Sequence, residues 1–199
     1  MTINTIQVEK TRKELVTISH MAYQRGLTSG TSGNPSARVP GSPELVLIKA
    51  TGTCFGTVEP EDFVLVDLDG NVLEGDKKPS KEVFFHCGIY KIRPDVQAVF
   101  HGHSAAVTAY ATKKNEFPLI TVASAALIKK VDIVEFALAG SPELKEMVIE
   151  KFTDTELKAC VLKRHGFITV GPSITAAYYM GDVLEDNAKT LCYMDTLGA

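Results

Sequence analysis

The chain has 199 residues, of which 45% are hydrophobic and 23% charged, a mixture typical of a globular protein rather than a disordered or collagen-like one. Its 21 basic and 24 acidic residues give a net charge of −3, which argues against nucleic acid or an anionic membrane as main partner, because both need a basic surplus. There is no apolar run of membrane-span length and no signal-peptide core. We therefore expect a cytoplasmic protein with one domain over residues 1–199.

The four cysteines, Cys54, Cys87, Cys160 and Cys192, are scattered and form no C-x-x-C pair. This spacing favours neither a disulfide framework nor a thiolate zinc site. We expect them to be buried, reduced thiols.

The first predicted element is a helix of about twenty residues. Leu15, Ile18 and Ala22 recur at helical spacing, and Gly26 follows where a left-handed stop residue would lie. Residues 28–36 are rich in glycine and small side chains, which predicts a loop or a tight entry into a strand.

The next segments predict a strand, a hairpin and a helix. Residues 44–50 are typical of a buried strand, and residues 63–73 of a hairpin that turns at Asp69 and Gly70. Residues 80–93 have helical periodicity, with Ser80 as N-cap and Pro94 preventing continuation.

The second half alternates the same element types. We predict a strand at 96–103, a helix at 104–112, a short β-rich run at 119–123 and a helix from Ser141 to about Lys151. Strands at 160–162 and 167–170 flank a polar hinge, and a final helix carries an apolar stripe from Ile174 to Leu191. The predicted fold class is α/β, a single three-layer α/β/α domain with a central, mainly antiparallel sheet.

Histidine placement points to a metal site. His101 and His103 lie two apart at the end of a predicted strand, so their side chains project to the same face. His165, in the hinge, can supply a third nitrogen, and three neutral imidazoles leave a fourth position on Zn²⁺ open, as in catalytic zinc sites. The alternative is a pair of hydrogen-bonded histidines without a metal.

Glu82 and His86 are four residues apart on the predicted helix and share a face. They can be ligands, or an acid with its hydrogen-bonded partner. Glu82 lies in the first turn, where the helix dipole favours anions, so simple dipole compensation is the alternative.

Six short motifs resemble the class II aldolase/adducin family, in its order and spacing. They are Gly30–Asn34, Ala50–Gly52, Lys78–Glu82, Arg93–Asp95, His101–Ser104 and Arg164–Gly166. The resemblance covers residues 8–195. Members of this family include L-fuculose-1-phosphate aldolase and L-ribulose-5-phosphate 4-epimerase.

The resemblance implies a role for each matching residue. His101, His103 and His165 match the zinc ligands, and Glu82 matches an acid that ligates zinc in the empty enzyme and acts as base when substrate binds. The substrate phosphate is implied to bind at Gly33, Asn34, Thr51, Gly52 and Ser80, with Lys81 adding a positive charge. His86 matches a histidine that is not a ligand, and His20 has no functional counterpart.

The implied reaction is zinc-dependent cleavage of a ketose 1-phosphate, similar to L-fuculose 1-phosphate, to dihydroxyacetone phosphate and an aldehyde through a metal-stabilised enediolate. Imidazole and carboxylate ligands also suit Mn²⁺ and Co²⁺. The family further implies a homotetramer with active sites at subunit interfaces.

The sequence departs from the family pattern in three places. A C-terminal tail tyrosine has no counterpart before the end at Ala199. Tyr193 is a candidate substitute, although its helical spacing favours packing. Residues 119–126 offer neither the tyrosine nor the aspartate that a neighbouring subunit supplies, although Lys129 and Lys130 follow and can bind an anion or simply be solvated.

The third departure is Lys81, in a run over residues 75–83 that is similar to the family's 3-oxo-tetronate 4-phosphate decarboxylases. Decarboxylase and epimerase activities are therefore alternatives to the aldolase. A non-catalytic interaction domain, like the adducin head, is the alternative from a different class.

Overall fold

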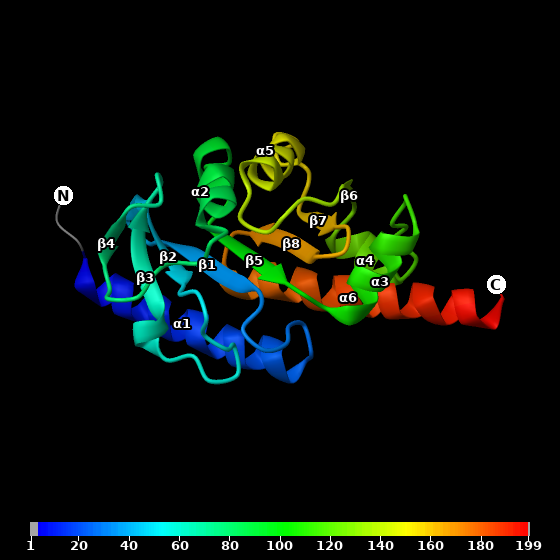
Figure 1. The fold of residues 1–199 in the computed structure, drawn as a ribbon, viewed down its shortest axis with the longest axis horizontal. Helices are drawn as coiled ribbons and strands as arrows, with labels where there is room; N and C mark the ends of the chain where they lie inside the picture. Colours follow the sequence, from blue (N-terminus) through cyan, green and yellow to red (C-terminus); the bar gives the residue numbers. More distant parts are fainter. Residues whose placement is uncertain (1–3, 199) are drawn as a thin grey trace.

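The computed structural model describes residues 4–198 and has an eight-stranded sheet between layers of helices (Figure 1). The strand order is β4-β3-β2-β1-β5-β8-β7-β6. The strands are β1 (Asn34–Val39), β2 (Ser42–Lys49), β3 (Phe63–Asp67), β4 (Val72–Glu74), β5 (Ala98–Gly102), β6 (Val131–Val134), β7 (Ala159–Leu162) and β8 (Gly166–Gly171). Neighbouring strands pair antiparallel except β6 and β7, which are parallel. The predicted mainly antiparallel α/β fold is confirmed.

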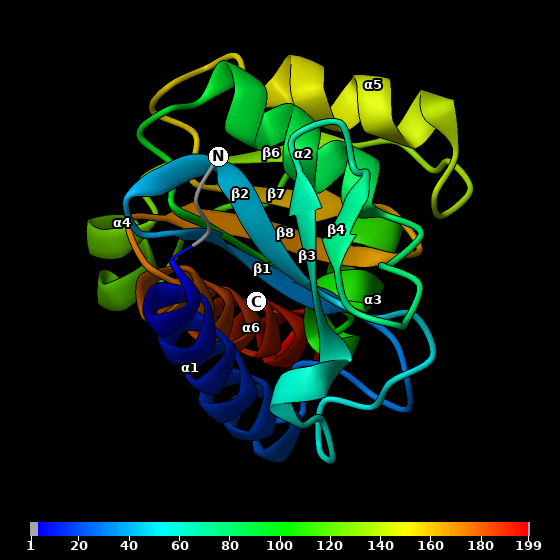
Figure 2. The ribbon, with the colours of Figure 1, turned by 90° about the vertical axis from the view of Figure 1, so that its left-hand side faces the viewer.

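Helices cover both faces of the sheet (Figure 2). They are α1 (Thr5–Gln24), the 3₁₀ turn η1 (Pro60–Asp62), α2 (Val83–Ile92), α3 (Ala105–Lys113), α4 (Val122–Leu127), α5 (Pro142–Lys151) and α6 (Ile174–Leu197). α2 and α5 lie on one face, and α1 and α6 on the other, where α3 and α4 pack against α6.

Two hydrophobic cores follow from strand alternation. In β2, Leu45 and Leu47 enter the core beneath α1 and α6, whereas Val46 and Ile48 enter the core beneath α2 and α5. Successive strand residues point to opposite faces, so the apolar run from Leu45 to Ile48 serves both layers.

Several sequence predictions are confirmed. The first helix, the hairpin of β3 and β4 and the last helix lie where the patterns predicted them. All four cysteines are free thiols, but only Cys87 and Cys160 are buried. Within residues 4–198, no helix is both long and apolar enough to cross a membrane.

The helix predicted from Ser80 begins later, at Val83, so Ser80 is not its N-cap. The reason is a tertiary contact: Pro79 forms a bridge with Ala50, and the Ser80 amide donates to Lys49 O. This pairing keeps the chain extended at Ser80. The Ser80 hydroxyl instead accepts from the Glu82 amide at 3.2 Å.

The predicted β-rich run at 119–123 is also wrong. Thr121 caps α4, and the amides of Ile120 and Thr121 donate to the buried Asn187 side chain of α6. A side chain therefore satisfies the donors that a strand partner would otherwise take. Strand β6 and most of β1 were not predicted.

Candidate metal centre

Strand β5, in the middle of the sheet, positions the first two histidines. His101 pairs with Asn34 of β1 on one side and with Ile168 of β8 on the other. His103 lies just beyond the strand, where its amide donates to Leu27 O at 2.9 Å. The two-residue spacing turns both rings to the same side, as predicted, with ring centroids 4.6 Å apart.

His165 is presented by the tight turn between β7 and β8. Arg164 adopts a left-handed conformation (φ 59°), which the turn needs in order to reverse within three residues. The next residue, Gly166, lies very close to the backbone of β5, because a Cβ there would lie only 2.1 Å from Gly102 O. Only glycine lets the hairpin lie against β5, and this contact brings His165 beside His101.

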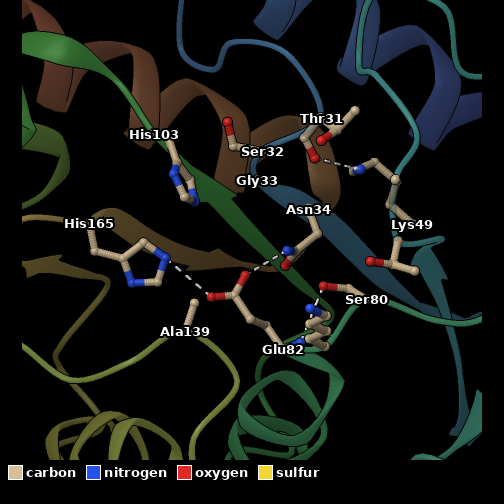
Figure 3. Close-up of a pocket in the computed structure, with 13 residues that line it drawn as sticks. Thr31, Ser32, Gly33, Asn34, Lys49, Ser80, Glu82, His103, Ala139 and His165 are labelled. Carbon is tan, nitrogen blue, oxygen red and sulfur yellow. Dashed lines mark hydrogen bonds and ion pairs between the residues drawn. The ribbon is translucent and has the colours of Figure 1, made fainter.

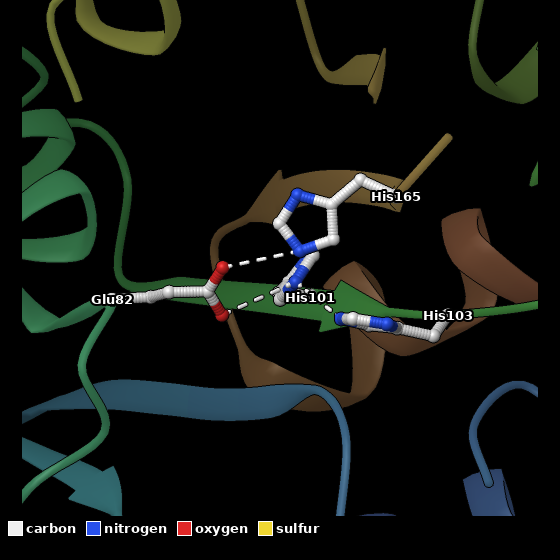
Figure 4. Close-up of side chains that lie close together, drawn as sticks. All are labelled: Glu82, His101, His103 and His165. Carbon is white, nitrogen blue, oxygen red and sulfur yellow. Dashed lines mark hydrogen bonds and ion pairs between the residues drawn. The ribbon is translucent and has the colours of Figure 1, made fainter. Parts of the chain in front are cut away.

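Glu82 completes the cluster from the N-terminus of α2 (Figure 4). Its Oε2 lies 3.3 Å from His101 Nε2, and its Oε1 lies 3.2 Å from His165 Nε2. The Nε2 atoms of His101 and His103 are 2.9 Å apart. One potential ligand atom from each of the four residues lies within 4.8 Å of all the others.

Burial and charge shift the ionisation of this cluster. Burial opposes ionisation of Glu82, but the positive charge of His101, the nearby rings of His101 and His165 and a hydrogen bond from Asn34 outweigh it and lower the pKa of Glu82. Burial likewise opposes protonation of His101, yet the Glu82 carboxylate raises the His101 pKa. The pKa of His103 is lowered to about 3 by burial and by the neighbouring histidines. The cluster therefore has a carboxylate facing imidazoles.

The donor set fits a divalent metal ion. His101 Nδ1 donates to Phe167 O at 2.8 Å, so the neutral ring turns the Nε2 lone pair toward the cluster; such a partner for the other ring nitrogen is usual in metal-bound histidine. Glu82 Oε1 and His165 Nε2 are buried, and no described residue forms a hydrogen bond with them. Three imidazoles and one carboxylate suit Zn²⁺, and also Mn²⁺ or Co²⁺.

A cavity of about 150 Å³ adjoins the cluster on the side of β1 and β2 (Figure 3). All six residues predicted to bind phosphate line it: Gly33, Asn34, Thr51, Gly52, Ser80 and Lys81. Gly33 and Gly52 have positive φ values of 73° and 77°. A Cβ at Gly33 would lie 2.7 Å from His101 O, so this loop needs glycine to approach β5.

Lys49 is a residue in this cavity that the sequence analysis did not single out. It is 1% exposed, and its Nζ donates to Thr53 O at 2.6 Å. Burial lowers its pKa to about 8. The available signal was a lysine inside a strand predicted to be buried, because lysine is almost never fully buried without a partner or a function.

A second, wider cavity of about 530 Å³ lies on the other side of His103 and His165. Its polar lining is mostly hydroxyl groups, from Ser29, Ser32, Ser104, Thr108 and Thr112. The Ser104 hydroxyl is buried, and no described residue forms a hydrogen bond with it.

Other predicted candidates lie elsewhere. His86 is buried outside the cluster and its ring bonds to Ser36 and Asn34, so it is neither a member of the cluster nor the direct hydrogen-bonded partner of the Glu82 carboxylate. His20 Nε2 lies 3.0 Å from Val58 O. Lys130 pairs with Asp154, and Tyr193 is 66% exposed on α6 rather than packed.

Comparisons with known proteins identify a family and named relatives within it. The sequence profile described as Class II Aldolase and Adducin N-terminal domain matches residues 13–192. A protein of Methanococcus vannielii named L-fuculose phosphate aldolase is 35% identical over 89% of this chain and 93% of its own length. A Haemophilus influenzae protein named 3-oxo-tetronate 4-phosphate decarboxylase is 33% identical over 89% of this chain and 85% of its own length.

A solved structure shows the same fold. The structure titled L-fuculose 1-phosphate aldolase superposes with a TM-score of 0.87 at 27% identity, over 96% of this chain and 88% of that one. Sequence and fold comparisons therefore agree on the same group of enzymes.

Proposed function

Since the chain belongs to the class II aldolase and adducin family, we propose that it is a zinc-dependent aldolase. Its substrate is a ketose 1-phosphate similar to L-fuculose 1-phosphate, and its products are dihydroxyacetone phosphate and an aldehyde. The observation that carries this proposal is the cluster of Glu82, His101, His103 and His165 at the wall of a cavity lined by backbone turns and a buried lysine. The relative named L-fuculose phosphate aldolase supports it.

In this proposal the first cavity holds the phosphate. Gly33 and Gly52 offer backbone amides at tight turns, and convergent amides bind anions well. The Thr51 amide donates to Lys78 O at 3.0 Å, so Thr51 contributes its hydroxyl instead. The Ser80 hydroxyl and the Lys49 ammonium add donors, and Lys49 adds a positive charge that desolvation strengthens. The non-phosphate half of the substrate lies toward the second cavity, beyond His103 and His165.

Glu82 handles the proton at the carbon that is cleaved. In the cleavage direction the C4 hydroxyl gives its proton to the ionised Glu82 carboxylate, the C3–C4 bond breaks with its electron pair staying on C3, and Glu82 passes the proton on to C3. In the synthetic direction the Glu82 carboxylate removes that proton. The buried Oε1 atom, which has no hydrogen-bond donor among the described residues, suits this exchange.

His101, His103 and His165, with Glu82 in the absence of substrate, would hold the metal. When bound, the ion supplies Lewis-acid polarisation of the substrate's carbonyl oxygen. Stoichiometric zinc in the purified protein is expected. Protein that folds and purifies without any divalent metal would favour the adducin-like interaction domain instead.

The direct test is product mass spectrometry with the zinc-loaded protein. The panel is a set of ketose 1-phosphates, ribulose 5-phosphate and 3-oxo-tetronate 4-phosphates. Dihydroxyacetone phosphate released from a ketose 1-phosphate supports the aldolase and identifies the aldehyde. A panel in which only ribulose 5-phosphate changes, to an isomer of equal mass with a new retention time, would favour the epimerase.

Decarboxylation of a 3-oxo-tetronate 4-phosphate is the second candidate. Lys81 lines the phosphate cavity, where it can pair with a substrate carboxylate, and the relative named for this decarboxylase supports it. Carbon dioxide released from the oxo acid, with the ketose phosphates untouched, would favour this activity over the aldolase.

We also propose a homotetramer with active sites at subunit interfaces. Leu138 is 70% exposed next to Ala139, which lines the phosphate cavity, and Val122 is 89% exposed on α4. Large exposed apolar side chains beside a site are typical of an interface. Analytical ultracentrifugation at micromolar concentration should give the mass of four chains, and the mass of one chain would contradict the proposal.

A further inference from the structure

A buried row of hydrogen bonds runs behind the metal cluster, between α2 and β1. Glu82 Oε2 accepts from Asn34 Nδ2 at 2.8 Å, and Asn34 Oδ1 lies 2.6 Å from His86 Nε2. His86 Nδ1 lies 2.7 Å from Ser36 Oγ, which in turn lies 2.8 Å from the Tyr90 hydroxyl. The row therefore reaches from Tyr90, deep in the core, to the cluster.

The row of hydrogen bonds can form because the spacing of side chains along α2 is close to their spacing along β1. Glu82, His86 and Tyr90 are four residues apart on one stripe of α2, and four helical residues advance about 6 Å. Asn34 and Ser36 are two apart on one face of β1, and two strand residues advance about 6.6 Å. The side chains of the helix and the strand can therefore alternate without a gap.

The ionised carboxylate of Glu82 sets the direction of the hydrogen bonds in the row. Ionised Glu82 can only accept, so Asn34 turns its NH₂ group to Glu82 and its oxygen to His86. His86 must then donate from Nε2. Burial lowers the pKa of His86 to about 3, so the ring is neutral and Nδ1 accepts from the Ser36 hydroxyl. Ser36 then accepts from Tyr90.

The row treats the two oxygens of Glu82 differently. Oε2 accepts a hydrogen bond from the Asn34 amide, whereas Oε1 lies 3.2 Å from His165 Nε2 and forms no hydrogen bond with the described residues. Resting on the proposed function, we propose that His86, Ser36 and Tyr90 are positioning residues: they lock the Asn34 amide onto Oε2 and leave Oε1 as the oxygen of Glu82 that exchanges the substrate proton.

The first test needs neither substrate nor metal. Nitrogen-15 NMR of the metal-free protein at neutral pH should show His86 with a protonated Nε2 and an unprotonated Nδ1. A ring protonated at Nδ1, or at both nitrogens, would overturn the proposal, because the Asn34 amide would then not be fixed by His86. This readout stays informative even if none of the proposed substrates reacts.

The second test removes a remote hydroxyl. Partners of metal ligands typically contribute 10- to 100-fold to activity or metal affinity, so Ser36→Ala should lower kcat about 10-fold and weaken zinc binding, measured by chelator competition, about as much. The KM for the phosphorylated substrate should change less than about twofold, because an interaction that acts on the reacting group alters kcat. Tyr90→Phe should have the same pattern, weaker.

Matched variants separate positioning from stability. Ser36→Thr keeps the hydroxyl and should restore kcat. Ser19→Ala removes an equally buried hydroxyl, bonded to Leu15 O at 2.7 Å in α1, and should leave kcat and zinc affinity unchanged. If Ser36→Ala lowers only the melting temperature, as Ser19→Ala is expected to do, the row is structural and the proposal is wrong. If Ser36→Ala does not fold, the His86 tautomer decides.

Discussion

The two cavities beside the histidines are built in different ways. The smaller one, about 150 Å³, is lined by buried polar groups such as Lys49, Asn34 and Ser80, each held by hydrogen bonds to its neighbours. The larger one, about 530 Å³, is lined mostly by small side chains and hydroxyls on and around α3. One is fixed by the chain before any ligand arrives, whereas the other is open.

The difference indicates what each cavity can recognise. Fixed donors and a buried charge select one anionic group strongly, because they are already oriented and desolvated. Hydroxyls at the wall of a wide cavity impose weaker preferences, since each can donate or accept. The four predictions below test this contrast, starting with a residue that both cavities share.

His103 lines both cavities, so its loss should disable both. In His103→Ala we expect loss of stoichiometric metal, measured by plasma mass spectrometry, and a fall in kcat/KM of about 10³-fold, corresponding to several kcal/mol of Lewis-acid stabilisation. His20→Ala is the matched control, because His20 lies outside the cluster and contacts Val58 O. One tightly held metal per chain in His103→Ala would contradict the assignment.

Lys49 is specific to the smaller cavity. A hydrogen bond to a charged group contributes about 1.5–3 kcal/mol, so Lys49→Met should raise the KM for a phosphorylated substrate by about 10- to 100-fold. Because burial lowers the Lys49 pKa to about 8, the ammonium form is present below that pH and lost above it. The kcat/KM of the wild type should therefore fall above about pH 8, and that fall should be missing in Lys49→Met.

The exposed Lys10→Met substitution on α1 is the control for Lys49→Met. Lys10 is exposed, far along the chain from the site, and forms an ion pair with Glu14 at 4.0 Å. Its KM and pH profile should match those of the wild type. An unchanged KM in Lys49→Met would show that the buried lysine serves the packing of the Thr53 turn and not the substrate.

The sequence predicted which residues form the candidate site better than it predicted the local backbone conformation around them. The spacing of His101 and His103 was enough to bring them together, because strand alternation is a local rule. Ser80 was placed in the right cavity but in the wrong local structure, since its amide donates to the carbonyl of Lys49, far earlier in the chain. Lys49 was not recognised because a strand pattern alone does not say which buried side chain faces a cavity.

The short elements also depend on contacts between distant residues, which local sequence patterns do not encode. Residues 119–121 have β-forming side chains, but Asn187 on the last helix takes their amides, and no local pattern encodes that contact. The hydrogen-bonded row of His86 and Ser36 needs the register of α2 against β1. Only the Glu82 and His86 spacing within α2 was visible in the sequence.

Lys81 lies at the exposed edge of the smaller cavity, so its effect should be moderate and depend on the substrate. Lys81→Gln should lower kcat/KM about 10-fold for a substrate with both a carboxylate and a phosphate, but less than about twofold for a ketose 1-phosphate, because solvent screens exposed charges. Lys78→Gln removes a nearby exposed charge outside the cavity and should leave both values unchanged. Equal losses for both substrates would show that Lys81 serves the phosphate.

Substitution of Ser104, in the larger cavity, should have the smallest effect of the four predictions. An N-cap serine normally contributes about 1 kcal/mol to the free energy of unfolding. Ser104 occupies the N-cap of α3, but its hydroxyl accepts no helix amide and is buried without a described partner. Its removal should therefore change the free energy of unfolding by less than about 0.5 kcal/mol, because an unsatisfied buried hydroxyl already costs its desolvation.

Ser141→Ala is the matched variant, because the Ser141 hydroxyl accepts from the Leu144 amide at 3.1 Å as the N-cap of α5. Urea unfolding should show a loss of about 1 kcal/mol for Ser141→Ala and almost none for Ser104→Ala. Ser104→Ala should nevertheless raise the KM a few-fold, since a hydroxyl that no residue within 4–198 uses is free to bind the non-phosphate half of the substrate. An equal stability loss in both variants would mean that Ser104 caps α3 in solution and that the larger cavity lacks this donor.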